Sequence, residues 1–145
     1  MQVIGFNFKK ISCERKKDKI EGKLEIKSNI NIEEIEKEKI ELIKEEQVLR
    51  FEFSFKVDYS PDFAELEFKG NVLIILDDEQ CKKVIKSWKD KKIPDDIRIP
   101  LFNLILTKCN LRSLQLEEEL GLPTHVPLPR LQAQESQQNN ANYTG

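Results

Sequence analysis

The segment Val48–Tyr59, VLRFEFSFKVDY, constrains the fold of this 145-residue chain more than any other segment. From Leu49 onward apolar and polar side chains alternate along it without interruption, and an extended chain places alternate side chains on opposite faces. The apolar set is Leu49, Phe51, Phe53, Phe55, Val57 and Tyr59, and the polar set is Arg50, Glu52, Ser54, Lys56 and Asp58. The pattern predicts a long antiparallel strand with one face in a core and the other in water.

A second strand is predicted to return beside the first. Ser60-Pro61-Asp62 is a turn signal, because proline suits the first corner of a β-turn and aspartate bonds to the local backbone. Alternating apolar residues follow at Leu66, Phe68, Val72, Ile74 and Leu76. We interpret Gly70, in the middle of this run, as a bulge. The two segments therefore predict a hairpin.

Two further strands are predicted before the hairpin. Residues 2–13 are rich in β-forming side chains, with Gly5 at a bulge or a close approach. Residues 19–32 place their apolar side chains on even-numbered positions, namely Ile20, Leu24, Ile26, Ile30 and Ile32. Residues 33–46 stay ambiguous between a helix, which would gather Ile32, Ile35, Lys39 and Ile43, and a strand from Ile40, which we favour.

The apolar period changes from 2 to 3.6 at Asp77-Asp78 and predicts two helices. The first carries Cys81, Val84, Ile85 and Trp88 on one face, and its acidic start and basic end suit the helix dipole. Asp95 and Asp96 are expected to cap the second helix, with Pro100 in its first turn or at a kink. Its apolar side chains cover most of the circumference, which predicts burial against the sheet and against a partner subunit. Gly121 is expected to end it.

The last part of the chain begins with GLPTHVPLPRL, Gly121–Leu131. Its prolines exclude a helix, while its aliphatic side chains favour a covered, extended segment. Residues 132–145 are rich in Gln and Asn and have almost nothing to bury, which predicts a disordered polar tail. We therefore expect one domain over residues 1–131 and a tail over 132–145.

The composition favours a protein without catalytic or cofactor chemistry. His125 is the only histidine, the three cysteines are widely spaced, and no glycine-rich phosphate loop occurs. We expect no metal, no cofactor and no enzymatic activity, and we read His125 as a surface or half-buried packing residue. No apolar run reaches the roughly 18 residues of a membrane span, and the N-terminus lacks signal-peptide order, so we expect a cytoplasmic protein without membrane insertion.

Two charged clusters have both a structural and a functional reading. The lysines of 82–92 favour a solvated helix face over a nucleic-acid site, because the net charge is −2 and the only tryptophan of the chain, Trp88, is predicted to point inward. The glutamates of 33–46 favour a solvated edge that discourages aggregation, with a docking patch for a basic partner as the alternative.

Four antiparallel strands followed by two helices on one side and an extended Pro-rich segment make a segregated α+β fold. Three stretches carry a further likeness: FKKISCERKK (8–17), VLRFEFSFKVDYSPDFAELEFKGNVLIIL (48–76) and IPLFNLILTKCNLRSLQLEEELGLPTHVPLPRL (99–131). They resemble the first strand, the third and fourth strands, and the long second helix with its proline-punctuated loop in the SecB family of protein-export chaperones. The resemblance covers about residues 2–131.

The resemblance implies a homotetramer, a dimer of dimers, that acts as an ATP-independent holdase. Such a chaperone binds unfolded or precursor polypeptides in apolar surface grooves, without nucleic acid. In that family a groove lies between the sheet and the loop after the long helix, and the residues carried over to it are Ile40, Leu42, Leu101, Phe102, Ile105, Leu122, Pro123, Val126 and Leu128. Members hand clients to a translocation ATPase in protein export, and relatives act in control of toxin–antitoxin pairs.

Two other functions stay open on the sequence. One is a non-chaperone oligomeric adaptor or structural protein, in which Gly121–Leu131 packs permanently on its own subunit. The other is nucleic-acid binding through the lysine-rich helix, which predicts strong salt dependence.

Overall fold

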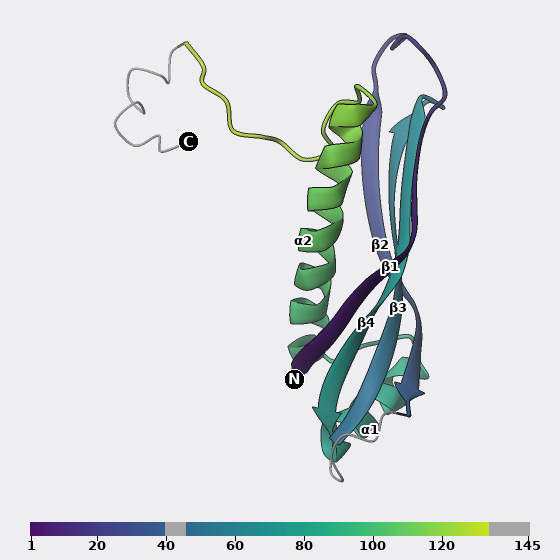
Figure 1. Ribbon diagram of the computed structural model, residues 1–145, viewed down its shortest axis with the longest axis vertical. Coiled ribbons are helices and arrows are strands. Elements are labelled where there is room, and N and C mark those ends of the chain that lie inside the picture. The colour runs from purple at the N-terminus through teal and green to yellow at the C-terminus, as the bar shows by residue number, and fades with distance from the viewer. Residues whose placement is uncertain (40–45, 134–145) are drawn as a thin grey trace.

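The computed structural model describes residues 1–39 and 46–133. Its elements, in chain order, are β1 (Gln2–Arg15), β2 (Glu25–Glu38), β3 (Glu46–Ser60), β4 (Ala64–Asp77), α1 (Asp78–Trp88) and α2 (Asp95–Glu119). The strands form one antiparallel sheet in the order β1-β4-β3-β2 (Figure 1). The predicted α+β fold, with four strands followed by two helices, is therefore confirmed.

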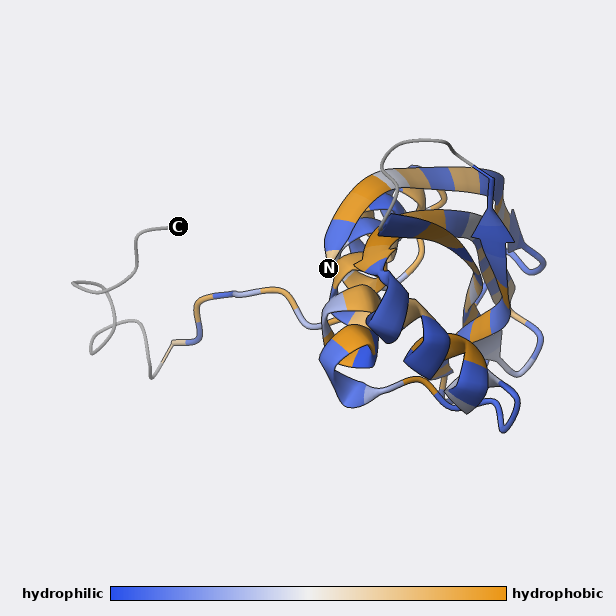
Figure 2. Ribbon diagram, turned by 90° about the horizontal axis from the view of Figure 1, so that it is seen from below, coloured by the Kyte–Doolittle hydropathy of each residue, from blue (hydrophilic) through white to orange (hydrophobic). Residues whose placement is uncertain are grey.

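The alternating faces of β3 and β4 make the core. Every predicted apolar position of β3 from Leu49 to Tyr59 is buried, and so are the matching positions of β4. The sheet curves around the helices, as the view along the long axis shows (Figure 2). One face of α2 closes the core, through Ile97, Leu101, Ile105, Cys109, Ser113, Leu116 and Glu117. Burying each large aliphatic or aromatic side chain contributes about 1.5–3 kcal/mol, so this seam dominates the stability of the fold.

Gly70 is not a bulge, which corrects the sequence interpretation. β4 runs through it in regular pairing with Phe53 of β3, and the register shift lies on β1, between Phe8 and Lys10. A Cβ atom on Gly70 would lie 2.2 Å from the backbone oxygen of Asn7. Glycine therefore stands here because two strands approach closely. The bulge expected near Gly5 is confirmed by the shift between Val3 and Gly5.

The N-terminal strands are longer than predicted or displaced from the predicted ranges. β2 covers Glu25–Glu38 and not 19–32, because the chain turns through Gly22, whose φ of 75° suits glycine. Ile26, Ile30 and Ile32 pair with core positions of β3 as expected, and a register shift after Ile32 brings Ile35 back to the same face. Residues 33–38 are therefore strand, while the predicted strand start at Ile40 lies outside the described residues.

The helix ends follow local chemistry. Asp77 caps α1, since its side chain accepts a hydrogen bond from the Gln80 backbone N–H at 2.7 Å. Asp95 and Asp96 lie inside the first turn of α2 and do not cap it, because the helix begins one residue earlier than expected, after Pro94. There they still complement the helix dipole. Gly121, with φ of 64°, follows the end of α2 as predicted.

Neither α1 nor α2 combines the length and the apolar character that crossing a bilayer would require.

Candidate functional site

An open groove of about 700 Å³ lies between β2 and the segment that joins α1 to α2. We call it the β2 groove. Its apolar lining consists of Ile30, Ile32, Trp88, Ile93 and Phe102. Its polar and charged lining consists of Asn31, Glu33, Lys91, Lys92, Asp95 and Arg98. The groove is therefore an apolar floor with charges of both signs around it.

Separate elements place the apolar side chains in the groove. Ile30 and Ile32 stand on the helix-facing side of β2, opposite Phe55 and Phe53 of β3. Because β2 is the outermost strand, their outer flanks are not covered by another strand. Trp88 is the last residue of α1, and it is half-buried, not turned wholly inward as predicted.

The turn after α1 fixes the far wall of the groove. Lys91 has a φ of 57°, and its backbone N–H donates to the Trp88 carbonyl at 2.9 Å. This tight turn holds the Lys91 ammonium nitrogen 4.5 Å from the centre of the Trp88 ring, within cation–π range. The indole is thereby held at the groove with one face toward a cation.

The charges around the groove do not favour a ligand of one sign. Arg98 pairs with Asp95 at 3.0 Å on the first turns of α2, while Glu33 faces them from β2. In residues 1–39 and 46–133, no cluster of His, Cys, Asp and Glu side chains has the arrangement to hold a metal ion. What the site offers is apolar area, mixed charge and an adjacent strand edge.

That edge is the outer side of β2. β2 pairs with β3 alone in the described sheet, so its other side presents backbone N–H and C=O groups that need a partner. An extended peptide can satisfy such groups by adding as a further strand, while its alternate side chains enter a neighbouring pocket. Ile30 and Ile32 belong to both the edge and the groove.

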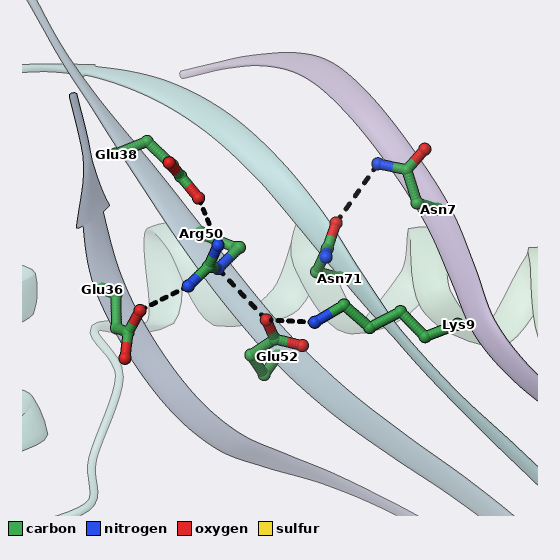
Figure 3. Close-up of polar contacts among 7 residues, drawn as sticks. All are labelled: Asn7, Lys9, Glu36, Glu38, Arg50, Glu52 and Asn71. Carbon is green, nitrogen blue, oxygen red and sulfur yellow. Dashed lines mark hydrogen bonds and ion pairs between the residues drawn. The ribbon is translucent and has the colours of Figure 1, made fainter. Parts of the chain in front are cut away.

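The opposite, convex face of the sheet carries an ion-pair network (Figure 3). The Arg50 guanidinium contacts the carboxylates of Glu36, Glu38 and Glu52, with 2.5 Å to Glu38 and 3.1 Å to Glu52. Lys9 from β1 reaches the same Glu52 at 2.9 Å. Arg50 and Lys9 thus offset part of the negative charge of these glutamates, and the interpretation of 33–46 as an acidic docking patch stays a prediction.

Two glutamates of this network also interact with each other. Glu34 and Glu36 lie two residues apart on the same face of β2 and share a hydrogen bond. That bond raises the pKa of Glu34, and the same bond, together with Arg50, lowers the pKa of Glu36.

The sequence-predicted site residues fall in different places. Phe102 lines the β2 groove, whereas Leu101 and Ile105 are wholly buried in the core beneath it. Past the other end of α2, Leu122 is buried, Val126 is half-buried, and Pro123 and Leu128 are exposed. The two groups are separated by roughly 25 Å along α2. Ile40 and Leu42 lie outside the described residues, and contact of any of these residues with a polypeptide stays a prediction.

Sequence reasoning did not place Ile30, Ile32, Trp88 or Ile93 in the site. Their pattern indicates core faces, and three of them are indeed partly packed against the core. One observation in the sequence could have indicated Trp88. It is the last residue of the amphipathic pattern, and a side chain at the end of a helix is less completely covered than one in its middle. That β2 would be an edge strand could not be known before the strand order.

The C-terminal segment is covered only at its start. Leu122 packs into the core, but beyond Val126 the chain leaves the body, and Leu128 and Leu131 are 55% and 56% exposed (Figure 1). α2 also exposes apolar side chains, because no other part of the described chain covers its outward side. Ile99 and Leu111 on that side are 52% and 60% exposed.

No family model matches the sequence, and no curated protein matches it either. A similar solved structure is that of a SecB-like chaperone of Mycobacterium tuberculosis in complex with a ChAD peptide from the HigA1 antitoxin. The TM-score is 0.51, the match covers 90% of this chain and 89% of that chain, and the sequences are 13% identical. At this identity the likeness is one of fold, and the fold is SecB-like.

Proposed function

We propose that the protein is an ATP-independent holdase chaperone that binds extended apolar segments of unfolded polypeptides. The observation that carries the proposal is the β2 groove beside an unpaired strand edge. The proposed site is the groove lining, with Phe102 as the residue shared with the sequence prediction.

The groove would bind the side chains of a client, and the edge of β2 would bind its backbone. Ile32, Trp88 and Phe102 would take apolar client side chains, which bind without strict geometry because the hydrophobic effect is non-directional. The edge of β2 would bond to the client backbone, which every sequence possesses. The result is binding of low sequence specificity and modest affinity per site, raised by several sites on one oligomer.

The SecB-like neighbour supports this proposal, since that protein is a chaperone in complex with a peptide. We propose a cytoplasmic setting, in which the clients are precursor proteins for export or an antitoxin segment. The β2 glutamates that contact Arg50 do not distinguish an export precursor from an antitoxin segment as the client.

The direct test uses an unfolding client and the purified full-length protein without nucleotide. We expect light scattering from client aggregation to fall as the protein is added, with a complex of defined mass. Trp88 is the only tryptophan, so its emission should shift when a tryptophan-free apolar peptide enters the β2 groove. Unchanged aggregation at every ratio would contradict the holdase and would favour the oligomeric adaptor.

We also propose that subunits associate through the outward side of α2, in a dimer of dimers. Exposed Ile99 and Leu111, with half-buried Leu104 and Leu114, give that side an apolar surface that water does not favour. Leu111→Asp should lower the native mass while leaving the fold intact, because Leu111 makes little contact within its own chain. Leu128→Asp, an equal change at an exposed site off the helix, should keep the mass of the unaltered protein. A single-chain mass for the unaltered protein would contradict the association.

A further inference from the structure

A buried polar cluster joins the end of α2 to the C-terminal segment. It consists of Tyr59, Asn110, Glu117 and His125, and we call it the Glu117 cluster. The side chains of Glu117 and His125 are 0% and 1% exposed. An isolated carboxylate at such a depth would cost several kcal/mol, so its hydrogen bonds must be accounted for.

Glu117 accepts hydrogen bonds from two residues. The Tyr59 hydroxyl donates to its Oε2, and the His125 backbone N–H donates to the same oxygen at 2.9 Å. The His125 ring nitrogen Nδ1 lies 2.9 Å from Oε1 and 3.1 Å from Oε2. These donors suit an ionised carboxylate.

The other ring nitrogen also faces an oxygen. His125 Nε2 lies 2.8 Å from Oδ1 of Asn110. A neutral imidazole has one donor and one acceptor nitrogen, whereas an imidazolium has two donors. The charged ring therefore satisfies both contacts, while the neutral ring would bring a lone pair against Oδ1 unless the Asn110 amide turned over.

Two other side chains around the cluster have raised pKa values, and a third is a permanent cation. Burial, and after it the bond to Glu117, strongly raises the pKa of Tyr59, which stays a donor. Cys13 of β1 also has a raised pKa, from burial first and then from Glu117 and Glu119. Arg15 of β1 is a permanent cation and donates to the Leu120 and Gly121 carbonyls at 3.0 and 3.2 Å. β4 presents apolar side chains on this face, and His125 is the side chain whose two ring contacts differ between its charged and neutral forms.

The cluster holds the root of the C-terminal segment. The Leu122 backbone N–H donates to the Glu117 carbonyl at 2.8 Å, and the Tyr59 hydroxyl lies 3.1 Å from the carbonyl of Pro123. The His125 ring stands edge-on to Phe55, with 6.0 Å between ring centres. Beyond this point the segment has left the body (Figure 1).

We propose that the Glu117 cluster is a proton-dependent latch, which holds residues 122–126 against the sheet while His125 is charged and frees them when the ring loses its proton. Release would uncover the Phe55 region of the sheet and add Leu122 and Val126 to the exposed apolar surface of the segment. The latch is closed at low pH and opens as the pH rises through the titration of the ring. It does not depend on the chaperone proposal.

Nuclear magnetic resonance of the full chain tests the latch. His125 is the only histidine, so its ring signals report protonation without ambiguity. Backbone order parameters for 124–126 should be about 0.85 with the ring charged and should fall below about 0.6 once it is neutral. Asn110→Asp, which fixes an anionic acceptor at Nε2, should move the midpoint of release up by about one pH unit or more.

Three further variants make the test decisive. Glu117→Gln should leave the segment mobile at every pH, while Glu118→Gln, at the exposed neighbouring position, should behave like the unaltered protein. His125→Gln should abolish the pH dependence. Because residue 125 lies outside the sheet and the helices, this variant keeps the test valid if Glu117→Gln fails to fold. Order that stays constant while the ring titrates, or pH dependence that survives in His125→Gln, would overturn the latch.

Discussion

Gly70→Ala is expected to be the most damaging single-methyl change in the described sheet, with a loss of about 3 kcal/mol in the free energy of unfolding. The new Cβ would lie 2.2 Å from the Asn7 backbone oxygen and 2.9 Å from Cζ of Phe53. The phenyl ring is in the core, and the oxygen belongs to a paired strand, so neither can move without breaking other contacts. For a chain of this size the loss corresponds to a fall of about 10 °C in Tm.

Gly5→Ala is the matched control for this prediction. Gly5 is also a strand glycine without a positive φ, but its nearest contact would be Leu73 Cδ1 at an ordinary 3.4 Å. Urea and thermal unfolding followed by circular dichroism measure both variants. Equal stability of the two would show that β1 can shift away from β4 at little cost, and the close-approach explanation would then be wrong.

The hairpin of β3 and β4 could be predicted because one face of it is wholly buried and the other is wet. Under that condition a shift of the strand register by one residue would move every buried phenylalanine side chain of the hairpin to the solvent face. The alternating pattern of the sequence therefore specifies the register that the structure adopts. β2 offers less information. Ile20 and Leu24 continue its even-numbered pattern in a segment that turns at Gly22, and the local pattern cannot reveal where pairing with β3 starts.

Gly70 was misread as a bulge, and the buried polar partners of the half-buried His125 were missed, for a common reason. A strand glycine has two frequent explanations, a bulge or a close approach, and only the position of Asn7 on the neighbouring strand distinguishes them. A lone histidine in an extended segment is ordinarily a packing residue. Its partners, Glu117 and Asn110, lie on α2, and Glu117 stands in a run of three glutamates that looks solvent-exposed in sequence.

The β2 groove could not be predicted from the sequence either. Its lining comes from an edge strand, the end of a helix, a turn and the start of another helix, and no local pattern joins them. Resemblance to a family supplied Phe102, but it also supplied residues at the far end of α2. Tertiary placement decides which apolar residues remain accessible once the core is filled.

Phe102→Glu is expected to weaken the binding of an apolar peptide at least tenfold. Phe102 is half-buried at the groove, and loss of about 1.5–3 kcal/mol of apolar contact corresponds to a factor of ten or more in Kd. The substitution would also place a carboxylate on the apolar floor of the groove, beside Asp95 and Glu33, where an apolar side chain of the peptide would have to bind.

Trp88 stays in place in this variant, so the same fluorescence titration measures both proteins. The control is Leu128→Glu, which makes the same apolar-to-acidic change on the exposed C-terminal segment and should bind as the unaltered protein does. Circular dichroism confirms the fold of each variant first. If Leu128→Glu lost binding and Phe102→Glu kept it, the client would lie on the C-terminal segment, because only there would a new charge meet the peptide. The β2 groove would then be a feature of packing alone.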